Sequence, residues 1–362
     1  MFQALCYVAE QFGWNFIFLY AFGQGFDFTG ITIYFILEFA SCAAFIPLVR
    51  RLPILPAMRL GLVLRMAAFA LLLHFFWQGQ LYIASVLLGA FVTFFWIPYN
   101  TRYVQLTRDG SRAQSSAALF MLFAVLGATL PALAGLVIVL YGFDSVLLVC
   151  IAVIAAGLLA SYRLDPAGEM AIELGPMLRR TRRLWYVLLA EGFWQGVFWL
   201  GVPLGLILNV NGADEYGAFY SLFGLLGGAA SIIAGRWSDR QGSRRPPIYA
   251  SAVAGGLLSI AAGLALDNVA LWAPALSAVY FCIYVLWPFT FCAVSELSTT
   301  PAEAMTVREF LTNIGRVAGG LLVLAVLLLF PSDSRSAALS AAYVAGGAAL
   351  LALAAGYRAL KY

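Results

Sequence analysis

The sequence contains little charge. Only 10% of its 362 residues are charged, against about a quarter in an average soluble domain. One histidine, His74, excludes a histidine-rich metal cluster, and the five cysteines lie in apolar segments without a CxxC spacing, which favours packing residues over a disulfide or metal site. No GxxxxGK[ST], HExxH or nucleophile-elbow pattern occurs. We therefore expect no cofactor, no ATP hydrolysis by this chain and no enzymatic activity.

What the sequence does contain is a series of long apolar segments, within a composition that is 63% hydrophobic. A helix needs about 20 mainly apolar residues to cross a bilayer. The alternation over about 10 residues that marks a membrane β-barrel is absent. We predict an all-α integral membrane protein with twelve transmembrane helices, at residues 3–23, 28–49, 56–76, 80–106, 113–140, 144–162, 184–208, 215–235, 247–266, 269–296, 303–330 and 336–357.

The basic residues predict the orientation of these helices. The first segment has no basic leader and no small-residue cleavage site, so we expect it to be retained as a helix. With cytoplasmic N- and C-termini, every arginine and lysine except Arg335 falls in or near a cytoplasmic loop or tail, as the positive-inside rule requires. We expect a multi-pass protein of the cell (inner or plasma) membrane. Its net charge of +4 follows from this topology and gives no reason to expect a nucleic-acid partner.

The two halves of the chain resemble each other. The polar stretch from Arg163 to Arg183 divides the segments six and six, which predicts an N-terminal half at 1–163, a cytoplasmic linker at 164–183 and a C-terminal half at 184–362. Matching motifs occur in the same order in both: Ala9-Glu10-Gln11-Phe12 with Ala190-Glu191-Gly192-Phe193, Asp27-x-x-Gly30 with Asp214-x-x-Gly217, Trp96-Ile97-Pro98 with Trp287-Pro288, and helix-start signals at Ser111 and Thr300. An even number of helices per half predicts a parallel repeat, with a central cavity between the halves.

One charged stretch carries a recognisable pattern. Residues 235–245 read Gly235-x-x-x-Asp239-Arg240-x-Gly242-x-Arg244-Arg245, at the end of the eighth predicted helix. This closely resembles the signature loop of the major facilitator superfamily, and the repeat and helix count extend the resemblance over the chain. The matching position of the first half, Arg50-Arg51-Leu52-Pro53, keeps positive charge but lacks the glycine and the aspartate. The resemblance implies that Asp239 and Arg240 stabilise contacts between the halves when the cytoplasmic side is closed.

Carboxylates inside apolar helices are candidates for function, because charge in hydrocarbon costs several kcal/mol. Glu10 and Glu191 occupy equivalent places in the first and seventh helices, and the resemblance puts helices 1, 4, 7 and 10 around the central cavity. Both residues could bind and release protons during transport. The alternative is a permanent ion pair, for example of Glu10 with Arg102. For Glu38, in the second helix, we favour a structural pairing with Arg65.

The eleventh predicted helix has a polar face. Glu309, Asn313 and Arg316 share it, and the deep Arg316 needs a partner. Glu309 is two turns away, which we judge too far, so we expect an acidic substrate group or Glu191. Further candidates on the presumed cavity helices are Asn100, as a polar contact, and seven aromatic residues that serve either packing or binding: Trp14, Trp96, Tyr99, Trp194, Trp199, Tyr284 and Trp287.

These features together predict a secondary transporter that moves a small organic molecule by alternating access, driven by protons. Its expected partners are the substrate, protons and the lipid bilayer, and we expect a monomer. Two alternatives stay open: a uniporter or lipid-like flippase in which Glu10 and Glu191 are structural, and a transporter-shaped scaffold or receptor that moves nothing.

Overall fold

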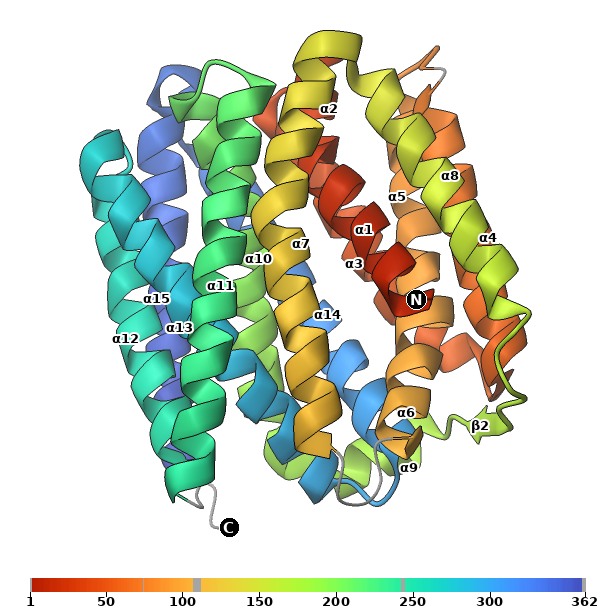
Figure 1. Ribbon diagram of the computed structural model, residues 1–362. Coiled ribbons are helices and arrows are strands. Elements are labelled where there is room, and N and C mark those ends of the chain that lie inside the picture. The colour runs from red at the N-terminus through yellow and green to blue at the C-terminus, as the bar shows by residue number, and fades with distance from the viewer. Residues whose placement is uncertain (1, 74, 107–111, 242–244, 360–362) are drawn as a thin grey trace.

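The chain folds into a bundle of long helices packed side by side (Figure 1). The computed structural model describes residues 2–73, 75–106, 112–241 and 245–359. The α-helices are α1 (Phe2–Gly13), α2 (Ile17–Gly23), α3 (Phe28–Phe45), α4 (Ile54–Leu73), α5 (Gly79–Phe91), α6 (Ile97–Leu106), α7 (Arg112–Tyr141), α8 (Phe143–Ser161), α9 (Leu174–Arg180), α10 (Trp185–Asn209), α11 (Ala213–Gln241), α12 (Arg245–Leu264), α13 (Val269–Leu297), α14 (Pro301–Leu329) and α15 (Arg335–Ala359).

Within the described residues, nine helical stretches are long and apolar enough to cross a membrane: 28–48, 54–73, 79–106, 143–161, 182–209, 246–264, 269–291, 301–329 and 332–357. Each corresponds to one predicted segment. The other three predicted segments coincide with α1 and α2, with α7, and with α11. Over their described residues, these three segments are not both long enough and apolar enough to count as membrane-spanning helices. A total of twelve membrane crossings therefore stays a prediction.

Two predicted helices are interrupted near their middle. A 3₁₀ turn at Trp14–Phe16 separates α1 from α2, and a π-helical turn at Val92–Trp96 separates α5 from α6. Pro98, the second residue of α6, has no backbone N–H to donate. π-Helical turns of this kind are often found at functional sites.

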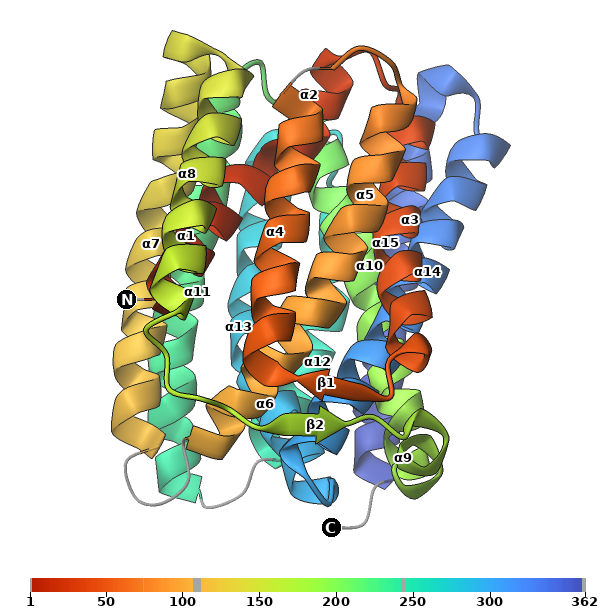
Figure 2. The ribbon, with the colours of Figure 1, turned by 90° about the vertical axis from the view of Figure 1, so that its right-hand side faces the viewer.

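A small sheet corrects the all-α expectation. Strands β1 (Arg51–Pro53) and β2 (Glu169–Ala171) pair antiparallel, with Leu52 opposite Met170. Backbone hydrogen bonds flank the pair, from Ile172 N to Arg50 O at 2.9 Å and from Ile54 N to Gly168 O at 3.2 Å. The polar linker thus lies along one end of the bundle, beside α9, as Figure 2 shows. We call this the β end.

Two helix starts are capped by side chains, and the one at Thr300 is as the sequence predicts. Asp27 caps α3 by accepting a hydrogen bond from Gly30 N at 2.8 Å, and Thr300 caps α14 by accepting one from Glu303 N at 3.1 Å. The motif partner of Asp27, Asp214, lies inside the first turn of α11 instead. The other predicted cap, Ser111, is outside the described residues.

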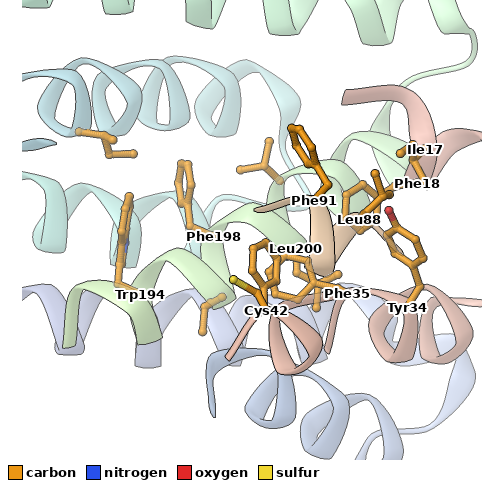
Figure 3. Packing of buried hydrophobic residues seen from close by; sticks show 14 of the residues in the cluster. Ile17, Phe18, Tyr34, Phe35, Cys42, Leu88, Phe91, Trp194, Phe198 and Leu200 are labelled. Carbon is orange, nitrogen blue, oxygen red and sulfur yellow. The ribbon is translucent and has the colours of Figure 1, made fainter. Parts of the chain in front are cut away.

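The core is aromatic and continuous. Phe18 of α2 packs edge-on against Tyr34 of α3 at 5.9 Å between ring centroids, and Trp194 stacks on Phe198 of α10 at 4.8 Å, as Figure 3 shows. Between the sequence halves, α7 packs along α11, and α3 and α6 pack against α14. These contacts bring residues that are far apart in sequence into the centre of the bundle.

Candidate functional site

Helices α10 and α14 approach each other closely because glycines line their contact. A Cβ atom on Gly192 would collide with the carbonyl oxygen of Thr312, and one on Gly319 with that of Phe193. Only glycine lets two helix backbones come this near. The close approach holds the polar side chains of α10, among them Glu191, against those of α14.

Four charged side chains meet at this contact. Arg308 Nη2 lies 3.2 Å from Glu191 Oε1, and Arg308 Nη1 lies 3.2 Å from Glu309 Oε1. Arg316 Nη1 lies 3.6 Å from the other oxygen of Glu309. Glu191 is fully buried, and Glu309 and Arg316 are nearly so. Two carboxylates thus share two guanidinium groups away from solvent, and their formal charges cancel.

Uncharged amides complete this network. Gln195 donates to Glu191 Oε1 at 3.0 Å and accepts from Arg316 Nε at 2.8 Å. Arg316 Nη1 donates to Asn313 Oδ1 at 2.9 Å, and Asn313 Nδ2 donates to the backbone oxygen of Glu309 at 2.6 Å. The expected polar face of α14 is therefore present. The expectation that Glu309 is out of reach of Arg316 is wrong, because two long side chains bridge the two turns between them.

Aromatic rings cover the network on its central side. The Arg316 guanidinium carbon lies 4.5 Å from the centre of the Trp199 ring and 5.1 Å from that of Phe39. Trp199 in turn contacts Trp14 at 6.0 Å and Trp287 at 5.9 Å between centroids. We call Trp14, Phe39, Trp199 and Trp287 the central aromatic cluster. It joins the turn after α1 to α3, α10 and α13.

A second charged cluster lies on the N-terminal side. Arg65 of α4 is 1% exposed and pairs with Glu10 of α1 at 2.7 Å between Nη1 and Oε2. Arg102, the suggested partner of Glu10, instead donates to the backbone oxygen of Asp165 in the linker at 2.8 Å. Glu10 therefore forms an ion pair, but with a residue that sequence spacing did not indicate.

Glu38 does not pair with Arg65 as expected. It is 3% exposed, and its Oε1 accepts a hydrogen bond from Trp14 Nε1 at 3.3 Å. Among the described residues, no basic side chain lies within 4.0 Å of this carboxylate. Arg65 is already held by Glu10, and it also faces the ring of Phe91 at 4.7 Å.

The remaining candidates take no part in the ion pairs of the two charged clusters. Tyr99 stacks on Phe95 at 5.6 Å and, like its neighbour Asn100, takes no part in the ion pairs above. Trp287 belongs to the central aromatic cluster. Of the charged motif, Gly235, Asp239 and Arg240 lie within α11, which continues six residues beyond its predicted end, and Arg245 begins α12. Gly242 and Arg244 are outside the described residues.

Sequence reasoning missed two members of the site. Gln195 follows Glu191 by four residues and so shares its helix face, a spacing that could have revealed it. Arg308 had been assigned to the cytoplasmic loops, although it directly precedes Glu309. The role of Trp14 as a hydrogen-bond donor to Glu38 depends on the 3₁₀ turn after α1 and has no sequence signal.

A nearly all-helical bundle with membrane-length helices and charged side chains buried between them is typical of membrane transporters. The chain belongs to the Major Facilitator Superfamily, because the sequence profile of that family matches residues 2–320. It is accordingly a secondary transporter of small molecules. Among proteins with curated functions, none matches the sequence.

Solved structures agree on the fold. A POT family transporter in complex with a thioalcohol-conjugated peptide superposes with a TM-score of 0.72 at 14% identity, covering 98% of this chain and 94% of the other. A POT family transporter in complex with 5-aminolevulinic acid gives a TM-score of 0.70 at 14% identity, with the same coverage. At this identity the likeness establishes the fold alone.

Proposed function

We propose that this protein is a proton-coupled secondary transporter that moves a small organic molecule by alternating access. In this proposal twelve helices form two six-helix halves, 1–163 and 184–362, joined by the linker 164–183. The β end faces the cytoplasm together with both termini, in the cell membrane, and the protein acts as a monomer. The basic residues near that end support the orientation.

Proton coupling rests mainly on one observation, the sharing of arginines between Glu191 and Glu309. Arg308 contacts both carboxylates, and Arg316 contacts only Glu309. If Glu309 took up a proton, Arg308 could pair with Glu191 alone and Arg316 would lose its charged partner. A single proton would thus rearrange contacts between α10 and α14.

Alternating access is supported by the contact between α7 and α11, one from each half. A Cβ on Gly224 would collide with the carbonyl oxygen of Gly127, and one on Gly217 with that of Pro131. In addition, Tyr216 Oη donates to the backbone oxygen of Asn15 at 3.1 Å. Small residues, and few polar bonds among the described side chains, make a surface that can separate and close again.

The resemblance of residues 235–245 assigns Asp239 to closing the cytoplasmic side. In this proposal Asp239 faces the N-terminus of the predicted helix that starts at Ser111 and Arg112, where a carboxylate is favoured by about 0.3–1 kcal/mol. We expect Asp239→Asn to weaken this closure, so that cysteines placed near the β end react faster with a maleimide. Unchanged labelling would rule out this role.

Proton movement tests the main proposal. Proteoliposomes with an internal pH dye are challenged with small cations, sugars, amino acids and carboxylates, using wild type, Glu191→Gln, Glu10→Gln and, as a control, Glu215→Gln at an exposed position. We expect one class of compound to move protons in wild type and Glu215→Gln, but at least tenfold more slowly in Glu191→Gln.

The other outcomes separate the alternatives. Substrate movement without a proton signal would contradict proton coupling and favour a uniporter. No movement of any compound would favour a scaffold or receptor. A loss in Glu10→Gln alone would place coupling in the N-terminal cluster instead of the α10–α14 network.

A further inference from the structure

We propose that the substrate is an organic cation, recognised by the Glu38 carboxylate and by the tryptophans of the central aromatic cluster. This inference rests on the proposed transport function and adds a substrate class to it. The ligand chemistry is a substituted ammonium group carried on an apolar body.

The first argument is a charge balance in the middle of the bundle. Among the described residues there, the carboxylates are Glu10, Glu38, Glu191 and Glu309, and the guanidinium groups are Arg65, Arg308 and Arg316. Every one of these except Glu38 has an ionic partner. The centre therefore carries one carboxylate more than it has arginines, and a monovalent cation would balance it.

The second argument is the state of the Glu38 side chain. One oxygen accepts the Trp14 indole N–H, whereas Oε2 is buried without a hydrogen bond. The Tyr34 hydroxyl, one turn earlier on α3, lies near the same carboxylate without the geometry of a full hydrogen bond. A buried carboxylate oxygen in this state is costly unless a positive group approaches it. Glu38 thus has one buried carboxylate oxygen without a hydrogen bond or an ionic partner among the described residues.

The third argument is the aromatic surroundings. Trp14, which binds Glu38, meets Trp199 edge to face, and Trp199 meets Trp287 in the same way. Indole faces attract ammonium groups more strongly than other side-chain rings do. The Trp287 Nε1 atom is also buried without a hydrogen bond. Because these rings come from both halves of the chain, a ligand among them would contact both.

The same contacts disfavour an anionic substrate. Arg65, Arg308 and Arg316 are each within 4.0 Å of a carboxylate, and Arg316 also bonds to Gln195 and Asn313. An acidic substrate would have to displace these partners. The rival to an organic cation is a proton held permanently by Glu38, which would leave a neutral aromatic site.

Binding in detergent tests the inference without requiring transport. The full-length protein is titrated calorimetrically with benzyltrimethylammonium and with neopentylbenzene, its uncharged carbon isostere. We expect wild type to bind the ammonium compound at least tenfold more tightly than the isostere. Glu38→Gln should abolish that preference, whereas Glu303→Gln, a buried carboxylate paired with Arg180 outside the cluster, should keep it.

Tryptophan variants provide a second test in case Glu38→Gln folds poorly. Trp287→Leu retains the carboxylate, and we expect it to weaken ammonium binding by about three- to tenfold, which is the range of a cation–π contact. The exposed Trp77→Leu is its control. Glu38→Asp, which keeps the charge, should keep the preference for the ammonium compound.

The outcomes distinguish this inference from the proposed function. Equal binding of the ammonium compound and its isostere, or no ammonium binding by a well-folded wild type, would overturn it. Proton-coupled movement of a neutral or acidic compound would overturn it while the transport function stood. Ammonium binding without any flux would support the site and count against transport.

Discussion

Arg316 is a buried charge whose ionic and hydrogen-bonding partners, among the described residues, all come from α10 and α14. Its guanidinium contacts Glu309, Gln195 and Asn313, under the ring of Trp199. Removing one member of a buried ion pair typically costs about 3–5 kcal/mol, because the other charge is left unpaired. Its place in the network therefore makes Arg316 important for stability.

We predict that Arg316→Met lowers the melting temperature in detergent far more than Arg180→Gln does. Arg180 also pairs with a glutamate, Glu303, but Arg180 is half exposed, and without it the buried Glu303 keeps a hydrogen bond from Thr299 N at 3.1 Å. The double variant Arg316→Met/Glu309→Gln should recover part of the loss, since it removes the charge left behind. Similar melting temperatures for the two single variants would show that the network does not stabilise the fold.

At the scale of a residue, sequence predicted where charge is buried but not how it is paired. Glu10, Glu191, Glu309, Asn313 and Arg316 were all singled out as candidates. Their partners depend on which helices touch and at what height, and one sequence does not contain that information. The pairing of Glu10 with Arg65 joins α1 to α4, while the expected Arg102 reaches the linker.

At the scale of the element, hydropathy predicted where the helices lie but not the irregular turns within them. The segments and the cap at Thr300 follow from local chemistry, namely apolar length and a hydroxyl before Pro301. The 3₁₀ turn at Trp14–Phe16 and the π-helical turn at Val92–Trp96 do not, because tertiary packing overrides local preference there. The strand pair between residues 51–53 and 169–171 was missed because three-residue strands have no periodic signal.

At the scale of the whole molecule, two glycine contacts have different predicted roles. The contact of α10 with α14 lies within one half, whereas that of α7 with α11 joins the halves. A Cβ at Gly192 or at Gly224 would collide with a backbone oxygen of the facing helix. Overpacking of this kind costs about 1–3 kcal/mol. The cost at Gly192 should appear in a measurement of stability, and the cost at Gly224 in a measurement of conformation.

We predict that Gly224→Ala favours conformations in which α7 and α11 have separated, while Gly192→Ala lowers stability in every conformation. A cysteine at Ser221, whose hydroxyl now accepts a bond from Ala132 N at 2.9 Å, would report this in a background without the native cysteines. Maleimide labelling should rise several-fold with Gly224→Ala and stay unchanged with Gly192→Ala, which should instead lower the melting temperature. Unchanged labelling with Gly224→Ala would mean that this contact is a fixed part of the fold.

In the transport cycle proposed above, the linker also limits how far the β end can open. It is held on one side by the pairing of β2 with β1, and on the other by the ion pair of Arg180 with Glu303, at 2.8 Å. Only Ile172 and Glu173 separate β2 from α9, a length of about 7 Å at full extension. The linker therefore acts as a short tether, and in the proposed cycle the β end would open only slightly before the strand pair or the ion pair must break.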